Sequence, residues 1–211
     1  MSSSNLLQLE LPILNTIPPE QIAGVDEVGR GALFGPVVAA AVMLPLQQVD
    51  PLVQLGVTDS KKLSPHHREE LFGHICSAAI ACRVGMASVA EIDRMNILQA
   101  SLLAMKRAVV RLSPSPRLCL VDGNQSISGL TIPQHTLVKG DQRSLHIAAA
   151  SIVAKVWRDR LITRMARRFP NYDLASNKGY GTQKHREAVT KFGTSRYHRQ
   201  SFKPCQQAKV N

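Results

Sequence analysis

The stretch IAGVDEVGRGALFGPVVAAAVML, residues 22–44, decides the fold of this chain. It contains two apolar segments, rich in alanine and β-branched residues, with a glycine-punctuated bend between them. Segments of this kind predict two neighbouring strands of a sheet. Because they are apolar almost throughout, instead of at every second residue, we expect other elements to cover both faces of that sheet.

The sequence that follows alternates helices with further strands. A serine cap followed by proline predicts a helix over about 65–81. Ser88 and Glu91 form a capping-box pattern that opens a helical stretch to about Arg111. Further strands are predicted over 82–89, 117–124 and 131–141, and further helices over 144–169 and 182–192. This alternation indicates an α/β fold with one mixed central sheet flanked by helices.

The composition fits one globular domain with small additions. The chain has 211 residues, of which 44% are hydrophobic and 19% charged, and this excludes wholesale disorder and a fibrous repeat. We expect a loosely ordered lead-in over 1–20, the main domain over 21–170 and a basic, helical C-terminal extension over 171–211.

The sequence also bears on location and assembly. No apolar run reaches the ~18 residues of a membrane span, and the first residues lack the basic segment of a signal peptide. The four cysteines have neither zinc-site nor disulfide-framework spacing, so we expect reduced thiols and a cytoplasmic protein. No predicted helix has an exposed apolar face, so we expect a monomer with no membrane contact.

The net charge of +11 is concentrated in the C-terminal part. Residues 1–150 hold 12 Lys+Arg and 12 Asp+Glu, whereas residues 151–211 hold 14 and 3. Such a distribution indicates a polyanionic partner that is bound on one side of the protein, although a solvated basic surface has the same composition. The side chains expected to line a nucleic-acid duplex are Lys155, Arg158, Arg164, Arg167, Arg168, Lys178, Lys184 and Arg186. His146, His185 and His198 are further candidates, but single histidines are more often structural.

Four acidic residues stand among apolar residues and glycines, apart from other charges. Asp26 and Glu27 lie in the first predicted strand, Asp122 ends a later strand, and Asp141 precedes a helix. Buried acids are costly unless a cation or hydrogen bonds compensate them. Converging on one sheet edge, they would form an all-oxygen site suited to Mg²⁺ or Mn²⁺. Taken singly, Asp122 also fits a turn and Asp141 a helix cap.

The residues after the first strand bear on whether this convergence is possible. Adjacent strand residues point to opposite faces, so Asp26 and Glu27 reach one site only if the chain bends nearby. Gly29 and Gly31 favour such a bend, and Arg30 between them is available to a phosphate. Taken alone, the tripeptide is also typical of an ordinary turn.

Five segments in this order resemble one known family. They are GVDEVGRGALFGPVVAAAV, TDSKKLS, LVDGN, VKGDQRSLHIAAASIVAKVWRD and NKGYGTQKHREA. Together they resemble the bacterial type 2 ribonuclease H family, ribonuclease HII, from about Gly24 to Phe202. The resemblance implies a ribonuclease H-like fold and an endonuclease that cuts RNA in RNA/DNA hybrids and at single ribonucleotides in duplex DNA. Products would carry a 3′-hydroxyl and a 5′-phosphate, with incision on the 5′ side of the ribonucleotide.

The same resemblance implies roles for single residues. The family's catalytic and metal-binding quartet falls on Asp26, Glu27, Asp122 and Asp141, with Asp26 expected to bridge two metal ions. The substrate-binding positions implied by the motifs and by the basic segment are Gly29, Arg30, Gly31, Lys61, Lys155, Arg158 and Tyr180. The glycine–arginine–glycine segment would sense the ribose 2′-hydroxyl, and Tyr180 would stack at the RNA-to-DNA junction. A partly buried tyrosine anchor is the alternative for Tyr180.

The chemistry agrees with this resemblance. Phosphodiester hydrolysis needs an activated water, a stabilised leaving oxygen and charge neutralisation, which two cations roughly 3.5–4 Å apart supply together. A non-catalytic nucleic-acid-binding protein would explain the basic surface but not four acids at strand ends. A different nuclease of this fold, such as a junction resolvase, would explain the acids but not the glycine–arginine–glycine segment or Tyr180.

Overall fold

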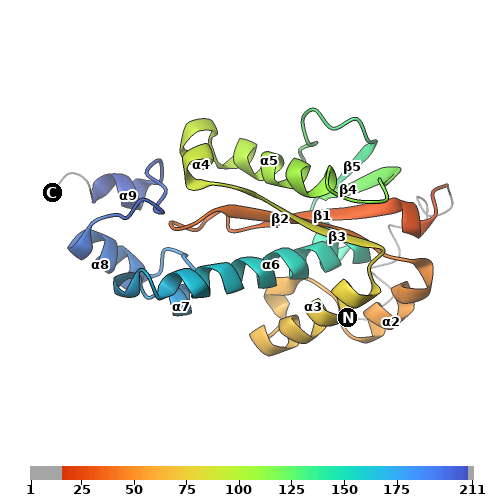
Figure 1. Cartoon of the computed structure of the whole chain (residues 1–211), viewed down its shortest axis with the longest axis horizontal. Helices are drawn as coiled ribbons and strands as arrows, with labels where there is room; N and C mark the ends of the chain where they lie inside the picture. The colour runs from red at the N-terminus through yellow and green to blue at the C-terminus, as the bar shows by residue number, and fades with distance from the viewer. Residues whose placement is uncertain (1–15, 209–211) are drawn as a thin grey trace.

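The computed structural model describes residues 16–208 and has a single five-stranded sheet between two layers of helices (Figure 1). The strand order is β3-β2-β1-β4-β5. The strands are β1 (Ile22–Val28), β2 (Val37–Met43), β3 (Ala81–Ala87), β4 (Leu118–Asp122) and β5 (Gln134–Leu137). β1, β2 and β3 pair antiparallel, whereas β4 lies parallel to β1 and β5 parallel to β4. The predicted α/β class, with a mixed sheet flanked by helices, is confirmed.

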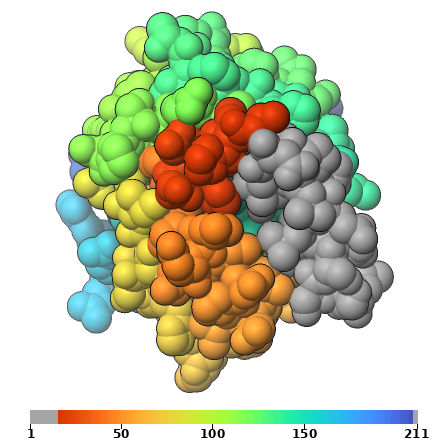
Figure 2. Space-filling model, turned by 90° about the vertical axis from the view of Figure 1, so that its right-hand side faces the viewer, coloured from red at the N-terminus to blue at the C-terminus, as the bar shows by residue number. Residues whose placement is uncertain are grey.

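The helices are distributed over both faces of the sheet and one end of the molecule. They are α2 (Val49–Gln54), α3 (Pro65–Ala78), α4 (Val89–Met95), α5 (Ile97–Val109), α6 (Leu145–Ala166), α7 (Leu174–Asn177), α8 (Gln183–Phe192) and α9 (Lys203–Gln207). The 3₁₀ turns are η2 (Pro19–Gln21), η3 (Leu46–Gln48), η4 (Ser60–Lys62), η5 (Gly140–Gln142) and η6 (Pro170–Tyr172). In Figure 1, α8 and α9 lie at the end of the molecule opposite to α2. Figure 2 faces the α2 end, where the residues just before β1, including η2, and the segment around α2 form the middle of the surface.

The alternating faces of β2 explain the two layers. Ala39 and Ala41 pack with α5 on one face, whereas Ala40 and Val42 pack with α6 on the other, and α2 and α3 add to that second cluster. All four side chains are buried, so β2 needs no polar residue on either face. The expectation from its apolar sequence is thereby confirmed.

Helix α6 approaches the sheet very closely. A Cβ atom at Gly24 in β1 would lie 2.0 Å from the carbonyl carbon of His146, so only glycine fits at this position. The small side chains at the start of α6, Ala148 to Ala150, are fully buried. This close contact brings the N-terminal half of α6 alongside the acidic residues of β1.

The structure differs from the predicted elements at several points. The stretch predicted as one helix to Arg111 is divided, because Asn96 has a left-handed backbone (φ 72°) and its side chain caps α5. Helix α8 is not the last helix, since α9 follows it, and α2 was not predicted. Residues 1–15 of the expected lead-in lie outside the described residues, and the boundary expected near residue 170 stays a prediction.

Strand β3 forms one edge of the sheet, where backbone groups lack a neighbouring strand. Three alternate carbonyls along it accept hydrogen bonds from arginine side chains: Cys82 from Arg83, Val84 from Arg111 and Met86 from Arg107. Arg107 also forms a two-bond pair with Glu91 in α4. Within residues 16–208, no helix is both long and apolar enough to cross a membrane.

Candidate active site

The parallel pairing of β1 with β4 brings three carboxylates together. Asp26 and Glu27 lie near the C-terminal end of β1, and Asp122 is the last residue of β4. The pairing of β1 with β2 is regular through Val28, so the strand itself has no bulge. The chain bends instead directly after it, at Gly29, whose φ is +91°.

The electrostatics of these carboxylates reflect their burial and proximity. Burial raises the pKa of Asp26 well above its ordinary value, and the negative charges of Glu27 and Asp122 raise it further. A hydrogen bond with the Ser151 side chain acts in the opposite direction. Burial likewise raises the pKa of Glu27, and the guanidinium of Arg30, 3.2 Å from its Oε1, opposes that shift. Around Asp26 and Glu27, the positive charge of neighbouring side chains therefore does not balance the negative charge of the carboxylates.

Asp141 joins the group through the turn η5. The backbone N–H of Gly140 donates to Oδ1 of Asp122 over 2.7 Å, which ties η5 to the end of β4. Asp141 itself is 5% exposed, and Nζ of Lys61 lies 3.7 Å from its Oδ2. Burial raises the pKa of Asp141, as do the charges of Asp59 and Asp122, while Lys61 lowers it.

Asp59 is a fifth carboxylate in this region that the sequence interpretation missed as a site residue. It is 5% exposed and caps η4 by accepting from the backbone N–H of Lys61 over 2.9 Å. Its Oδ2 accepts from Nε2 of Gln142 over 3.3 Å, so it connects η4 with η5. The only sequence signal was its place two residues before Lys61, and aspartate at such a position is also typical of a turn.

The donor set fits a hard divalent cation. The acids of the cluster offer carboxylate oxygens, which are the ligands that Mg²⁺ and Mn²⁺ prefer. The positive charge of a bound cation would favour the ionised carboxylates and would therefore oppose the rise in their pKa values. In the described part of the chain, no three His, Cys, Asp or Glu side chains are already arranged to hold one ion. Arg30 and Lys61 instead neutralise part of the charge through Glu27 and Asp141.

The bend after β1 contains two glycines in different settings. A Cβ atom at Gly29 would lie 2.1 Å from Nε of Arg158, and the positive φ is itself unfavourable for other residues. At Gly31, by contrast, a Cβ atom would have no heavy atom within 4 Å, and the residue is exposed. Arg30 between them has a side chain that is 51% exposed.

Comparison with known proteins decides the family. The family model described as ribonuclease HII matches residues 23–205, nearly the whole described chain. This chain belongs to the ribonuclease HII family. It is 65% identical over 187 residues to the ribonuclease HII of Acaryochloris marina, an alignment that covers 89% of this chain and 94% of the relative. Members of this family are ribonuclease H enzymes, so the chain is a hydrolase of the nuclease class.

Solved structures agree on the fold. The crystal structure of ribonuclease H2 from Pyrococcus horikoshii has a TM-score of 0.76 and 26% identity, and covers 90% of this chain and 97% of its own. The structure of Bst-RNase HIII in complex with Mn²⁺ has a TM-score of 0.75 at 20% identity, covering 93% of this chain and 71% of its own. The second similarity concerns the fold alone. The expected ribonuclease H-like fold is confirmed.

In this chain, Arg158 does not have the surface position expected of a substrate contact. Its side chain is fully buried and donates to the backbone carbonyls of Phe34, Pro36 and Lys178 over 3.0, 3.2 and 2.8 Å. The expectation that Arg158 contacts a duplex directly is wrong, because its helical position turns it toward the bend after β1. The side chain of the neighbouring Lys155 is 16% exposed and pairs with Asp159 over 2.9 Å.

Tyr180 lies next to these two basic side chains. The centroid of its ring is 5.4 Å from Cζ of Arg158 and 5.5 Å from Nζ of Lys155. Its backbone pairs with Ala32, in the segment that leads from the bend to β2. Tyr180 is therefore connected to the glycine–arginine–glycine segment, although the two are about 150 residues apart in the sequence.

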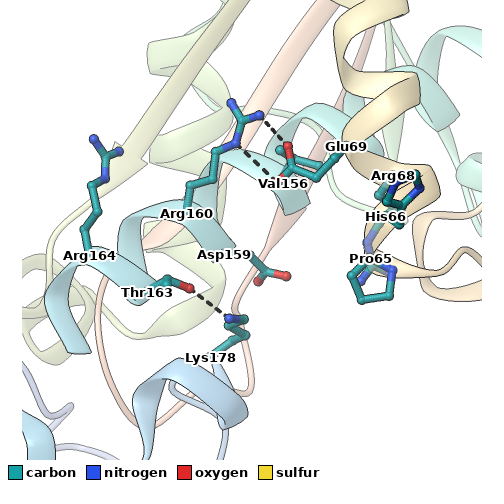
Figure 3. Close-up of a pocket in the computed structure, with 10 residues that line it drawn as sticks. All are labelled: Pro65, His66, Arg68, Glu69, Val156, Asp159, Arg160, Thr163, Arg164 and Lys178. Carbon is teal, nitrogen blue, oxygen red and sulfur yellow. Dashed lines mark hydrogen bonds and ion pairs between the residues drawn. The ribbon is translucent and has the colours of Figure 1, made fainter. Parts of the chain in front are cut away.

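A groove runs between the start of α3 and the C-terminal half of α6 (Figure 3). Its volume is about 720 Å³, and two of the basic residues expected at a duplex, Arg164 and Lys178, line it. Figure 3 shows Arg160 reaching across to Glu69 and Lys178 reaching to Thr163. The groove therefore combines basic side chains with acids that already neutralise part of their charge.

The three candidate histidines are all buried, which agrees with the structural alternative. Nε2 of His185 lies 3.1 Å from Nε2 of His198, and Nδ1 of His185 donates to the carbonyl of Tyr180 over 2.9 Å. Burial lowers the pKa of His198 to about 4, and the neighbouring His185 lowers it further. The fold thus holds His198 in its neutral form.

This burial predicts a pH dependence of stability. The pKa of His198 falls from an ordinary 6.5 to about 4 on folding. The contribution of the neutral His198 to the free energy of unfolding is therefore complete above pH 6.5 and is lost as the pH falls toward 4. We expect the melting temperature of His198→Gln to fall less steeply than that of the wild type over this interval, in circular-dichroism melts. His66→Gln, at an exposed histidine, should follow the wild type. Identical slopes for wild type and His198→Gln would contradict the assignment.

Proposed function

We propose that this protein hydrolyses the RNA strand of RNA/DNA hybrids and incises duplex DNA on the 5′ side of single embedded ribonucleotides. The products carry a 3′-hydroxyl and a 5′-phosphate, and the activity serves the removal of ribonucleotides from DNA. The observation that carries the proposal is the placement of a carboxylate cluster directly beside the bend at Gly29–Gly31. Membership of the family supports the same reaction class.

The acids in this proposal are Asp26, Glu27, Asp122 and Asp141, which would hold Mg²⁺ or Mn²⁺. When bound, the cations supply an activated water and neutralise charge on the scissile phosphate and leaving oxygen. Their support is the donor set of this chain, because the manganese-bound RNase HIII structure shares the fold alone. Asp59 assists by holding Lys61 close to Asp141.

Recognition of RNA must use the ribose 2′-hydroxyl, since phosphates and base edges differ too little between RNA and DNA. The backbone of Gly29, Arg30 and Gly31 lies beside the acids and is partly exposed, so its N–H and C=O groups suit a single hydroxyl. The ring of Tyr180 offers a flat surface for stacking near the same place. Lys61, Lys155, Arg164 and Lys178 would contact the phosphates of the duplex.

Cleavage of a DNA duplex that contains one ribonucleotide tests the proposal. We expect the wild type, with Mg²⁺ or Mn²⁺, to make one cut 5′ to the ribonucleotide, and EDTA to abolish it. An all-DNA duplex should remain intact, and Asp122→Asn should cut neither substrate. If the wild type binds the duplex but cuts nothing with either metal, the chain is a binding protein instead.

Tyr180 offers a test of stacking against simple anchoring. Within residues 16–208 its hydroxyl has no hydrogen-bond partner, so Tyr180→Phe should keep nearly full activity. Tyr180→Ala should lower cleavage at a single ribonucleotide roughly 10-fold or more, since one base–aromatic stack is worth about 1–3 kcal/mol. Single-turnover rates on that substrate provide the measurement. An alanine variant with wild-type rates would rule out stacking.

We also propose that the protein acts as a monomer in the cytoplasm. Its four cysteines are free thiols, which suits a reducing compartment. Sedimentation at micromolar concentration tests the assembly state, and a dimer mass would reject the monomer.

A further inference from the structure

Two arginines are buried side by side beneath the bend after β1. Arg158 and Arg199 are both 0% exposed, and no carboxylate in the described chain lies within ion-pair distance of either. A buried guanidinium is costly unless its donors are satisfied. Both side chains donate instead to backbone carbonyls, and four of the five accepting carbonyls belong to the segment from Arg30 to Pro36, the fifth being that of Lys178.

Arg199 makes the contact closest to the candidate site. Its Nη1 donates to the carbonyl of Arg30 over 2.8 Å, and its Nε donates to the carbonyl of Gly35 over 3.0 Å. The third nitrogen, Nη2, is buried without a hydrogen-bond partner, and Phe202 stacks on the guanidinium with its ring centroid at 5.1 Å. Burying an N–H donor without a partner is unfavourable. The position of the Arg199 side chain therefore serves its two carbonyl contacts and leaves one of its own donors unsatisfied.

The residue before Arg199 reaches Tyr180 by a second route. The carbonyl of Tyr180 only accepts, so Nδ1 of His185 carries the proton of that 2.9 Å bond and its Nε2 is left as an acceptor. Nε2 of His198 is then the donor across 3.1 Å, while its Nδ1 accepts from the backbone N–H of Ser195 over 2.9 Å. One proton arrangement therefore satisfies the whole chain from Ser195 to Tyr180.

We propose that the adjacent pair His198–Arg199 is a positioning element that fixes the ribose-sensing bend at Gly29–Gly31 relative to Tyr180. Arg199 holds the bend through the carbonyl of Arg30, and His198 holds Tyr180 through His185. Neither residue touches the substrate. The proposal rests on the proposed function, because it assigns the discrimination of RNA from DNA to the spacing that these contacts set.

A purely structural role for the same contacts is the alternative. Removing them would then lower the folded fraction and weaken binding of every duplex alike. A positioning role predicts a different pattern, in which binding of a ribonucleotide-containing duplex weakens and binding of an all-DNA duplex does not. The difference between the two affinities therefore separates the roles.

The experiment measures both affinities by fluorescence anisotropy in the full chain carrying Asp122→Asn, so that nothing is cut. Arg199→Lys keeps the charge, but one ammonium cannot span two carbonyls as the guanidinium does. We expect it to weaken binding of the ribonucleotide duplex roughly 10-fold, the equivalent of one well-oriented hydrogen bond, with all-DNA binding unchanged. Arg196→Lys, at an exposed arginine in the same segment, is the matched control and should change neither affinity.

The histidine supplies a second pair of variants if Arg199→Lys does not fold by circular dichroism. The amide nitrogen of glutamine can replace the Nε2 donor of His198, whereas asparagine is too short to reach His185. We expect His198→Gln to keep the preference for the ribonucleotide duplex and His198→Asn to lose it. Equal weakening of both duplexes, or an unchanged preference in the folded variants, would overturn the positioning role. A parent protein without any preference would instead contradict the proposed ribose sensing.

Discussion

Replacing Asp26 with asparagine is expected to reduce hydrolysis by about 10³-fold or more while raising the melting temperature. The loss of activity follows because a carboxylate at the centre of the cluster would be removed, and each ~1.4 kcal/mol of lost transition-state stabilisation is a factor of ten. The gain in stability follows from electrostatics. The pKa of Asp26 is raised in the folded state, so its ionisation destabilises the fold as the pH rises through and above the ordinary carboxyl range.

Asparagine keeps the shape of Asp26 and the acceptor for the backbone N–H of Glu27, but carries no charge. Rates on the single-ribonucleotide duplex and melts at pH 7 without divalent metal provide the two measurements. Asp50→Asn, at an exposed aspartate in α2, should alter neither. Added Mg²⁺ should raise the melting temperature of the wild type more than that of Asp26→Asn. A variant that loses stability in parallel with activity would show that Asp26 is a structural residue.

Alanine at the two glycines of the bend is expected to separate stability from catalysis. Gly29→Ala should destabilise the fold by more than about 2 kcal/mol, because alanine is strained at φ +91° and its Cβ would lie 2.1 Å from Nε of the buried Arg158. For Gly31→Ala, where a Cβ has open space, we expect stability within about 0.5 kcal/mol of the wild type. Its cleavage rate should still fall about 10²-fold, since a methyl group would displace the ribose by about 1 Å.

Urea titration and single-turnover cleavage of the same preparations measure these effects. A loss of activity in Gly29→Ala would follow either from a destabilised fold or from an altered site. In Gly31→Ala, which should remain stable, the same loss would follow only from an altered site. If Gly31→Ala cleaves at the wild-type rate, the backbone at this position does not sense the ribose.

Patterns along the chain were sufficient to predict most of the sheet. The two apolar segments around Gly29–Gly35 form β1 and β2 as expected, because strand pairing there depends on local hydrophobicity and a short connection. The break at Asn96 could not be read from periodicity, since apolar residues continue at helical spacing on both sides of it. Its cause is one left-handed residue whose side chain caps the second helix.

The candidate site was only partly predictable for a related reason. Asp26 and Glu27 stand out as acids in an apolar strand, and the motif resemblance adds Asp122 and Asp141. The role of Arg158 was predicted wrongly, because composition counts a charge without showing which face of α6 it occupies. Asp59 was missed because its partner Gln142 is 83 residues away, and only the folded chain brings the two turns together.

The arginines along β3 bear on how the protein behaves when it is concentrated. An open edge strand invites strand addition by another chain, the first step of sheet-mediated aggregation. On β3, a newcomer would have to displace the guanidinium groups that already donate to the carbonyls of Val84 and Met86, and its own strand would meet their positive charge. Strand addition at this edge is therefore disfavoured, and β3 is protected by the side chains of the chain's own arginines.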